Sequence, residues 1–227
     1  MAVTAYQPNV TSTGRLLTIA DVAVLPSDLP SGPMKYELDN GRLVSGPFKI
    51  ADISVMPRDL PSGAVDYELD NGRLVVMSPP VNRHSALQTR LNGELYVQAD
   101  CRGLGETRVE AGLILWRNPD RLVGPDLAFF SKNLFPLRES SEGYIETMPD
   151  LVFEVRSKND TLSEIQQKVT DYLNAGVKQV FIVDPAANTV AQHRVGAPVT
   201  MFGEHDILHL DDVIPGCSLS LAELFRL

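Results

Sequence analysis

Cysteine and long apolar runs are scarce in this sequence. The two cysteines, Cys101 and Cys217, lie far apart without the short spacing of metal ligands, which predicts ordinary buried thiols in a reducing compartment and neither a disulfide nor a zinc site. No segment approaches the roughly 18 apolar residues of a membrane span. The N-terminus also lacks a charged start followed by an apolar core. These absences predict a soluble, cytoplasmic protein with no membrane partner.

Positive charge is scarce as well. The chain of 227 residues has 20 Lys and Arg against 29 Asp and Glu, a formal net charge of -9 and a pI near 4.9. This balance argues against a broad non-specific nucleic-acid surface, although it leaves room for a local basic patch. It suits a protein that concentrates divalent cations in one carboxylate-lined cleft. The length and the 44% hydrophobic content fit one large domain, or one domain with an appendage.

A tandem duplication follows a polar N-terminal stretch. The segment ADVAVLPSDLPSGPMKYELDNGRLV, which starts at Ala20, recurs as ADISVMPRDLPSGAVDYELDNGRLV from Ala51, with 18 identities in 25 aligned positions. Each copy ends with Asp-Asn-Gly between short extended runs. This pattern predicts a hairpin with a type I′ turn, because Asn and Gly tolerate positive φ angles. Two copies are too few for a solenoid.

The two copies are predicted to occupy different places in the molecule. Glu37 and Glu68 are equivalent residues on the first arms of the two hairpins. The second copy runs directly into the rest of the chain, so Glu68 is expected in the core architecture. Glu37 is expected outside it, on a surface addition, a sheet extension or a subunit contact. We therefore divide the chain into a flexible arm (1–16), the first hairpin copy (17–45) and a main domain (46–227).

A strand, a helix and a parallel strand are predicted in the segment PDLVFEVRSKNDTLSEIQQKVTDYLNAGVKQVFIVDP, which starts at Pro149. The first strand places Glu154 on the face opposite Leu151, Phe153 and Val155. Burying an unpaired carboxylate in such a strand costs roughly several kcal/mol. Glu154 therefore needs a cation, a metal ion or a proton.

The helix of this unit is predicted to begin at a capping box formed by Thr161 and Glu164 and to end at Gly176. Its apolar stripe is formed by Leu162, Ile165, Val169, Tyr172 and Leu173. Lys168 lies beside this stripe, so its ammonium group can reach back over the sheet edge toward Glu154.

Shorter patterns predict the other elements. A helix is expected from Asn82 to about Asp100, with His84 interpreted as a helix-start residue; its apolar side is formed by Ala86, Leu87, Leu91, Leu95 and Tyr96. Strands are expected over 107–116, 123–130 and 189–195, a long loop over 131–147 and a closing helix over 219–227. The strand over 123–130 places Asp126 on one face.

Two adjacent strands therefore each carry one inward carboxylate, Asp126 and Glu154, and Lys168 lies on the helix that follows. Two carboxylates can hold one or two Mg²⁺ ions, with water completing the coordination shell. A nearby lysine can orient or deprotonate the attacking water. These groups predict the metal-dependent hydrolysis of a phosphodiester.

The chain resembles the Uma-two family of restriction endonucleases, within the PD-(D/E)xK nuclease superfamily. The resemblance covers roughly 18–227 and lies in an ordered set of motifs: YELDNGRLVVMSPP, a His-led helix, VGPDLAFF, PDLVFEVRSKND, a helix with Lys and Tyr, AGVKQVFIVDP and PGCSLSLAELF. It implies an α/β (α+β mixed sheet) fold class, a restriction-endonuclease-like mixed β-sheet flanked by helices, here with a duplicated N-terminal hairpin. It also implies a Mg²⁺-dependent enzyme, with Mn²⁺ as a substitute, that cleaves DNA.

The resemblance assigns roles to individual residues. It makes Asp126 and Glu154 the metal-binding pair and Glu68 a further ligand or a residue that positions water. The superfamily pattern has Lys two residues after the glutamate, where this chain has Arg156, which cannot act as a base but can contact phosphate. Lys168 on the helix is the substitute that the resemblance implies. A homodimer is expected from the family and from the hairpin edges.

Structural alternatives stay open for these residues. Asp126 can cap a strand end, and Lys168 can be a solvated helix residue. Glu154 can pair with Arg156 or with Lys168, which predicts a folded protein without metal affinity.

Glu68 can likewise be a cross-strand partner of Arg73. For the whole protein, one alternative is a catalytically inactive binding or scaffold protein with a nuclease fold. Another is a metal-dependent hydrolase of a small phosphate ester. Stabilisation of the protein by a divalent ion would distinguish an active enzyme from the inactive scaffold. A substrate screen would distinguish a nuclease from a hydrolase of small phosphate esters.

Overall fold

The two copies of the repeat form the N-terminal part of the molecule. The structure, a computed structural model, describes residues 15–43, 45–78, 82–158 and 160–226, so most of the predicted arm lies outside the described residues. The first copy forms α1 (Ile19–Ala23), β1 (Asp28–Leu29), β2 (Gly32–Pro33), β3 (Leu38–Asp39) and β4 (Arg42–Leu43). The second forms α2 (Ile50–Ile53), β5 (Asp59–Leu60), β6 (Gly63–Ala64), β7 (Asp66–Asp70) and β8 (Arg73–Met77).

Both copies contain the predicted hairpin turn. Asn40 and Gly41 in the β3–β4 turn have φ angles of 49° and 78°, and Asn71 and Gly72 in the β7–β8 turn have φ angles of 51° and 80°. Positive φ at both central residues defines a type I′ turn, which matches the right-handed twist of the two strands that it joins.

Reciprocal hydrogen bonds join the copies. The buried Asp21 carboxylate of the first copy accepts a hydrogen bond from Ser62 N at 2.9 Å. Its equivalent in the second copy, the buried Asp52, accepts one from Ser31 N at 2.9 Å. A contact that is made once in each direction indicates a two-fold relation between the copies. Apolar side chains from both copies also share one core. The first copy therefore packs on the second as one half of a unit.

The rest of the chain surrounds a six-stranded mixed sheet with the order β16-β15-β14-β13-β12-β9. Its strands are β9 (Gly105–Arg108), β12 (Leu127–Ser131), β13 (Leu151–Val155), β14 (Gln179–Asp184), β15 (Thr189–Arg194) and β16 (Thr200–Phe202). The central pair, β13 and β14, is parallel, whereas the other neighbouring strands are antiparallel. This arrangement confirms the predicted fold class and the parallel unit around Glu154.

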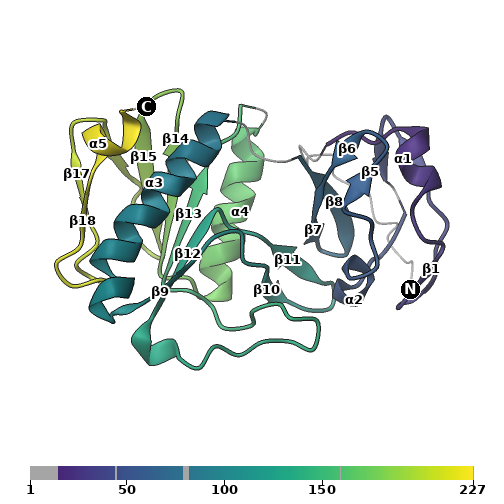
Figure 1. Cartoon of the computed structure of the whole chain (residues 1–227), viewed down its shortest axis with the longest axis horizontal. Coiled ribbons are helices and arrows are strands. Elements are labelled where there is room, and N and C mark those ends of the chain that lie inside the picture. Colours follow the sequence, from purple (N-terminus) through teal and green to yellow (C-terminus); the bar gives the residue numbers. More distant parts are fainter. Residues whose placement is uncertain (1–14, 44, 79–81, 159, 227) are drawn as a thin grey trace.

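Two long helices cover opposite faces of this sheet (Figure 1). The helix α3 (Asn82–Gln98), followed by the 3₁₀ turn η1 (Asp100–Arg102), packs on the face that presents Leu127, Phe129 and Leu151. The helix α4 (Leu162–Ala175) packs on the other face. The chain closes with a hairpin of β17 (Ile207–His209) and β18 (Ser218–Ser220) and with α5 (Leu221–Phe225).

A second sheet connects the repeat unit to this body. Its order is β10-β11-β7-β8, with β10 (Leu113–Trp116) and β11 (Arg121–Val123) coming from the body. The single strands predicted over 107–116 and 123–130 are therefore wrong, because each splits between the two sheets. Gly124 and Pro125 separate β11 from β12, since proline has no N–H for a ladder hydrogen bond. The 3₁₀ turn η2 (Lys132–Leu134) begins the long loop that was predicted.

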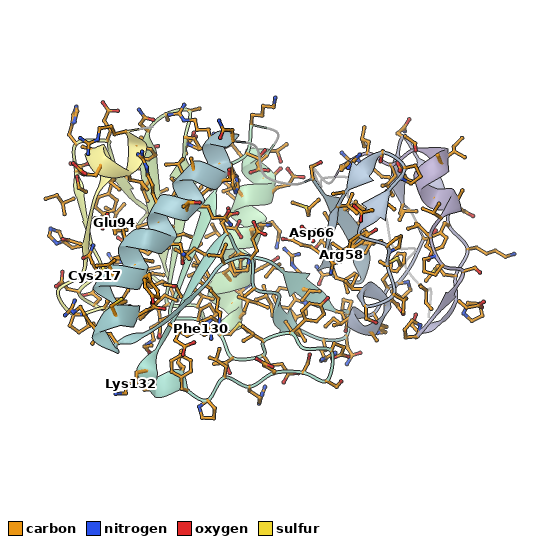
Figure 2. The ribbon with its side chains drawn as sticks, viewed as in Figure 1. Arg58, Asp66, Glu94, Phe130, Lys132 and Cys217 are labelled. Carbon is orange, nitrogen blue, oxygen red and sulfur yellow. The ribbon has the colours of Figure 1, made fainter. Side chains whose placement is uncertain are left out.

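Most predicted core positions are buried or partly buried, with three exceptions. Tyr96 is 54% exposed and Leu162 is 67% exposed, so both lie outside the apolar stripes to which the sequence assigned them. Of the two cysteines, Cys217 is buried but Cys101 is exposed. Figure 2 shows Phe130 within the body, and it shows Arg58 beside Asp66 on the repeat unit, where they form an ion pair. The capping box at Thr161 and the left-handed Gly176 confirm the predicted ends of α4.

Candidate active site

Asp126 and Glu154 face each other where β12 and β13 begin to separate. Leu127 is opposite Phe153 in the antiparallel register, which places Asp126 opposite Glu154 one step further on. Val155 N donates a hydrogen bond of 2.6 Å to Asp126 Oδ2 and so orients that carboxylate across the two strands. The side chains of Asp126 and Glu154 are 13% and 14% exposed. The two residues that the sequence paired are thus brought together in a nearly buried site.

Lys168 links the helix α4 to two acidic side chains. Its Nζ lies 3.1 Å from Glu68 Oε1 and 3.7 Å from Glu154 Oε1, and its side chain is 26% exposed. The alternative of a solvated helix residue is therefore wrong. Burial opposes the charge of Lys168, but the two carboxylates outweigh burial and raise its pKa. Lys168 is a protonated ammonium group within the acidic cluster.

Glu68 reaches this cluster from β7 of the second repeat copy. Its Oε1 accepts a hydrogen bond from Gly124 N at 3.2 Å in addition to the contact with Lys168. Its alternative partner, Arg73, pairs with Asp70 at 2.6 Å instead. Glu68 is 7% exposed, whereas its equivalent Glu37 is exposed, in agreement with the different places predicted for the two residues.

Glu154 is held by a buried phenol. The Tyr172 hydroxyl donates a hydrogen bond of 2.6 Å to Glu154 Oε1, and burial raises the pKa of Tyr172 well above its usual range, so it keeps its proton. Burial also raises the pKa of Glu154 to about 7; the Asp126 and Glu68 carboxylates add to the rise, whereas Lys168 and the Tyr172 hydrogen bond oppose it. Two of the three carboxylates thus contact Lys168, and Arg121 of β11 adds a second positive charge near Glu68.

His84 and Gln88 of α3 complete the surroundings of Asp126. His84 Nε2 lies 2.7 Å from Asp126 Oδ1, and Gln88 Nε2 donates to the Asp126 carbonyl at 3.0 Å. Burial opposes the charge of His84, but Asp126 outweighs burial and raises the pKa of the imidazole. The sequence interpretation of His84 as a helix-start residue missed this contact.

Arg156, the residue at the position of the motif lysine, points to a different partner. Its Nη1 forms an ion pair of 2.7 Å with Asp184 at the end of β14. Its side chain is 33% exposed. Of the two alternative partners of Glu154, Lys168 is the one observed and Arg156 is not.

The donor chemistry of the site fits a hard divalent cation. Asp126, Glu154 and Glu68 offer carboxylate oxygens, which Mg²⁺ and Mn²⁺ prefer. The Asp126 and Glu68 carboxylates add to the rise in the pKa of Glu154, and a cation beside these three groups would offset their mutual repulsion. Within the part of the chain that the structure describes, no three His, Cys, Asp or Glu side chains are grouped closely enough to enclose a metal ion. Water or substrate oxygens would therefore supply part of the coordination shell. The role of Glu68 as a ligand stays a prediction.

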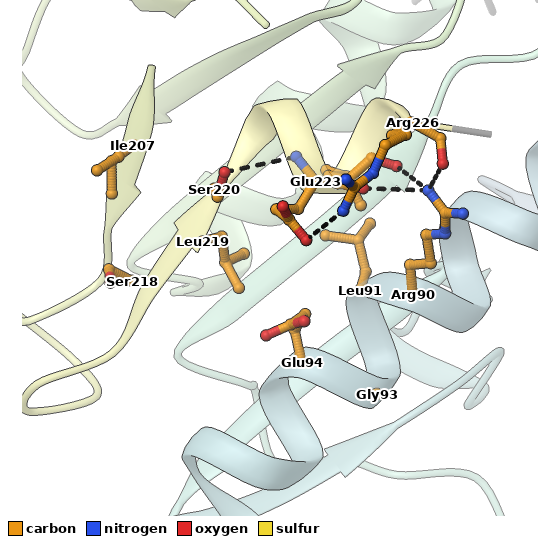
Figure 3. A pocket seen from close by; sticks show the side chains of 11 residues that line it. Arg90, Leu91, Gly93, Glu94, Ile207, Ser218, Leu219, Ser220, Glu223 and Arg226 are labelled. Atoms are coloured by element: carbon orange, nitrogen blue, oxygen red, sulfur yellow. Dashed lines mark hydrogen bonds and ion pairs between the residues drawn. The ribbon is translucent and has the colours of Figure 1, made fainter. Parts of the chain in front are cut away.

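A separate pocket of about 580 Å³ lies between α3 and the C-terminal elements β17, β18 and α5 (Figure 3). Arg90 on its rim donates hydrogen bonds to the carbonyl oxygens of Glu223, Leu224 and Arg226 and so satisfies the end of α5. Glu94 also lines this pocket, but none of the residues around Asp126 does. The pocket is distinct from the carboxylate site.

A mixed sheet with helices on both faces, and with two facing carboxylates beside a lysine, is the arrangement of a restriction-endonuclease-like nuclease. The model of the Uma2 family, described as "Putative restriction endonuclease", matches residues 56–222. The chain belongs to this family. The match begins within the second repeat copy and therefore leaves out the first.

Among solved structures, the chain is similar to the crystal structure of a putative nuclease of the DUF820 family from Anabaena variabilis. The TM-score is 0.64 and the identity is 18%, with 79% of this chain and 98% of that chain covered. At this identity the similarity shows the fold. No curated protein matches the chain. Among the described residues, no helix is both long enough and apolar enough to cross a membrane.

Proposed function

We propose that the protein is a divalent-metal-dependent endonuclease that hydrolyses phosphodiester bonds in DNA. The observation that carries the proposal is the placement of Asp126 opposite Glu154, with the Lys168 ammonium 3.7 Å from Glu154 Oε1. Membership of the Uma2 family supports a nucleic-acid substrate. DNA as the substrate, Mg²⁺ as the preferred ion, a homodimeric state and a cytoplasmic location are the finer parts of the proposal.

Asp126 and Glu154 would hold the metal ion, and Mn²⁺ would substitute for Mg²⁺. A divalent ion at these carboxylates would polarise the phosphate and lower the pKa of a bound water. Val155 N orients Asp126 and Tyr172 orients Glu154, so both carboxylates are fixed before substrate arrives. Preorganisation of this kind reduces the reorganisation that the reaction requires.

Lys168 orients the attacking water and stabilises negative charge on the phosphate. Its raised pKa keeps the ammonium group charged, which favours hydrogen-bond donation over proton removal. In this proposal Glu68 fixes the position of Lys168 through their contact of 3.1 Å. Arg156 contacts a phosphate near the scissile bond. To do so, its side chain releases Asp184 and binds the substrate phosphate instead.

The experiment is a DNA cleavage assay with Mg²⁺ or Mn²⁺ on wild type and Asp126→Asn, with single-stranded, double-stranded and branched substrates. The expected result is cleavage by wild type and its loss in the variant, with an unchanged circular dichroism spectrum. Asp150→Asn is the matched control. Asp150 is also buried, but it lies at the other end of β13 and pairs with Lys178 at 2.6 Å. Equal cleavage by wild type and Asp126→Asn would refute the assignment.

A further inference from the structure

The second repeat copy binds the body through a defined set of contacts. Ile50 at the start of α2 is fully buried, and its N–H donates to Asp120 Oδ2 at 2.9 Å. Gly72 N donates to the Asp120 carbonyl at 2.8 Å. Leu69 of β7 then pairs with Leu122 of β11. The second copy thus binds β11 and the aspartate that directly precedes it, through one buried apolar residue, two backbone donors and the edge of β7.

The first copy has the same face, turned away from the body. The residues equivalent to Ile50, Leu69 and Gly72 are Ile19, Leu38 and Gly41. The backbone geometry is repeated, because Leu17 N donates to Gly41 O at 2.7 Å just as Phe48 N donates to Gly72 O at 2.7 Å in the second copy. The N–H groups of Ile19 and Gly41 therefore occupy the places from which Ile50 and Gly72 bind Asp120.

The outer face consists of Ile19, Leu38 and Gly41; Ile19 is exposed, whereas Leu38 and Gly41 are half-buried. Ile19 is 84% exposed although its equivalent is fully buried. Within the described residues, β3 pairs only with β4, whereas β7 pairs with β8 on one side and with β11 on the other. Figure 1 shows the reason: α2 lies next to β10 and β11, and α1 lies at the far end of the molecule. The two-fold relation of the copies turns equivalent faces in opposite directions.

We propose that the outer face is a docking site for a β-strand of another protein, one that is directly preceded by an aspartate and has an apolar residue at the position of Leu122. The aspartate binds the N–H groups of Ile19 and Gly41, and the strand that follows adds to the edge of β3. The chemistry of the partner follows from Asp120, Arg121 and Leu122, which fill the equivalent site within the chain. A second copy of this chain is not the occupant, because its own Asp120 strand is held by its second repeat copy. The inference is independent of nuclease activity.

The test uses the full chain and a peptide of residues 113–123, LILWRNPDRLV, closed by a cross-link between its ends. Isothermal titration is expected to give one site for wild type. Ile19→Glu is expected to weaken binding at least tenfold, because it places a charge at the apolar anchor. Replacing the aspartate of the peptide with alanine is expected to weaken binding to a similar degree. Since Ile19 is mostly exposed, the variant is expected to keep its fold and its thermal transition.

Val24→Glu is the matched control. Val24 caps the C-terminal end of the same short helix and is 49% exposed, but its equivalent Val55 is also exposed, at 45%, and so takes no part in docking on the body. Binding should be unchanged in this variant. The proposal is overturned by three results: no binding at millimolar peptide, equal loss in Val24→Glu and Ile19→Glu, or a wild-type oligomer that Ile19→Glu dissociates. The last result would make the outer face a contact between copies of this chain.

Discussion

Divalent-ion binding is expected to weaken in mild acid, because Glu154 holds a proton near neutral pH. Burial raises the pKa of Glu154 to about 7, and Asp126 and Glu68 add to the rise. Only the ionised carboxylate binds a cation, so the proton competes with the metal. About nine in ten Glu154 side chains carry the proton at pH 6, and about one in ten at pH 8. The apparent Kd for Mn²⁺ is therefore expected to be about tenfold larger at pH 6, a difference of about 1.4 kcal/mol.

The assay is isothermal titration of Mn²⁺ at both pH values, in two buffers with different ionisation enthalpies. Comparison of the buffers gives the number of protons released on binding. About 0.9 proton is expected from Glu154 at pH 6 and about 0.1 at pH 8. His84 is a second proton source, because it contacts Asp126 and its pKa is also raised. The measurement is therefore repeated with His84→Gln, which has no titrating ring.

The reasoning would be refuted if His84→Gln bound Mn²⁺ with equal affinity at pH 6 and pH 8 and released no proton at either pH, while Glu154→Gln still weakened Mn²⁺ binding. That combination would show that Glu154 takes part in binding but is already ionised at pH 6. If Glu154→Gln binds Mn²⁺ as tightly as wild type, the residue is not a ligand and the carboxylate pair is wrongly assigned.

Three further predictions concern single side chains. Lys168→Met should keep Mn²⁺ binding in isothermal titration but reduce the cleavage rate by about 10²- to 10³-fold, since it removes a charge donor and no ligand. Arg121→Met should lower the free energy of unfolding by about 3–5 kcal/mol in urea, because its buried partner Asp171, 2.8 Å away, loses its counter-charge; adding Asp171→Leu should restore most of the loss. Burial opposes the ionisation of Asp21, but hydrogen bonds from Thr18 and Ser62 hold its pKa well below the usual range, so its contribution to stability is present above about pH 4 and is lost in stronger acid. Asp21→Asn should therefore lower stability by about 1 kcal/mol at pH 7 and make the urea midpoint less dependent on pH between pH 4 and pH 2.

The parts of the site that the sequence predicted are those with a local signal. Glu154 interrupts an apolar strand, and Lys168 lies beside the stripe of the next helix, so both follow from residue spacing. The register of β12 and β13 then brings in Asp126. β13 and α4 follow one another within the strand-helix-strand unit, and β12 is the strand that precedes this unit in the chain.

The contacts that the sequence analysis missed join distant segments. Lys168 and Glu68 are 100 positions apart, and His84 and Asp126 are 42 apart. Neither pair has a spacing that would relate one partner to the other. The split of 123–130 between two sheets has a similar cause, because Leu122 pairs with Leu69 far back in the second repeat copy. Hydrophobic alternation is the same in either sheet, so it does not reveal which partner strand is chosen.

The near identity of the two repeat copies gives the chain two competing ways to fold. If the first copy docked on β10 and β11, Glu37 would take the place of Glu68 beside Lys168, and the chemistry of that position would be preserved. Buried side chains oppose the exchange: Phe48 and Ile53 of the second copy are larger than their equivalents Leu17 and Val22. Each methyl-sized void costs about 1 kcal/mol. Correct docking thus depends on a few positions where the copies have diverged. A substitution that makes the copies more alike would reduce the free-energy difference between the two docked arrangements.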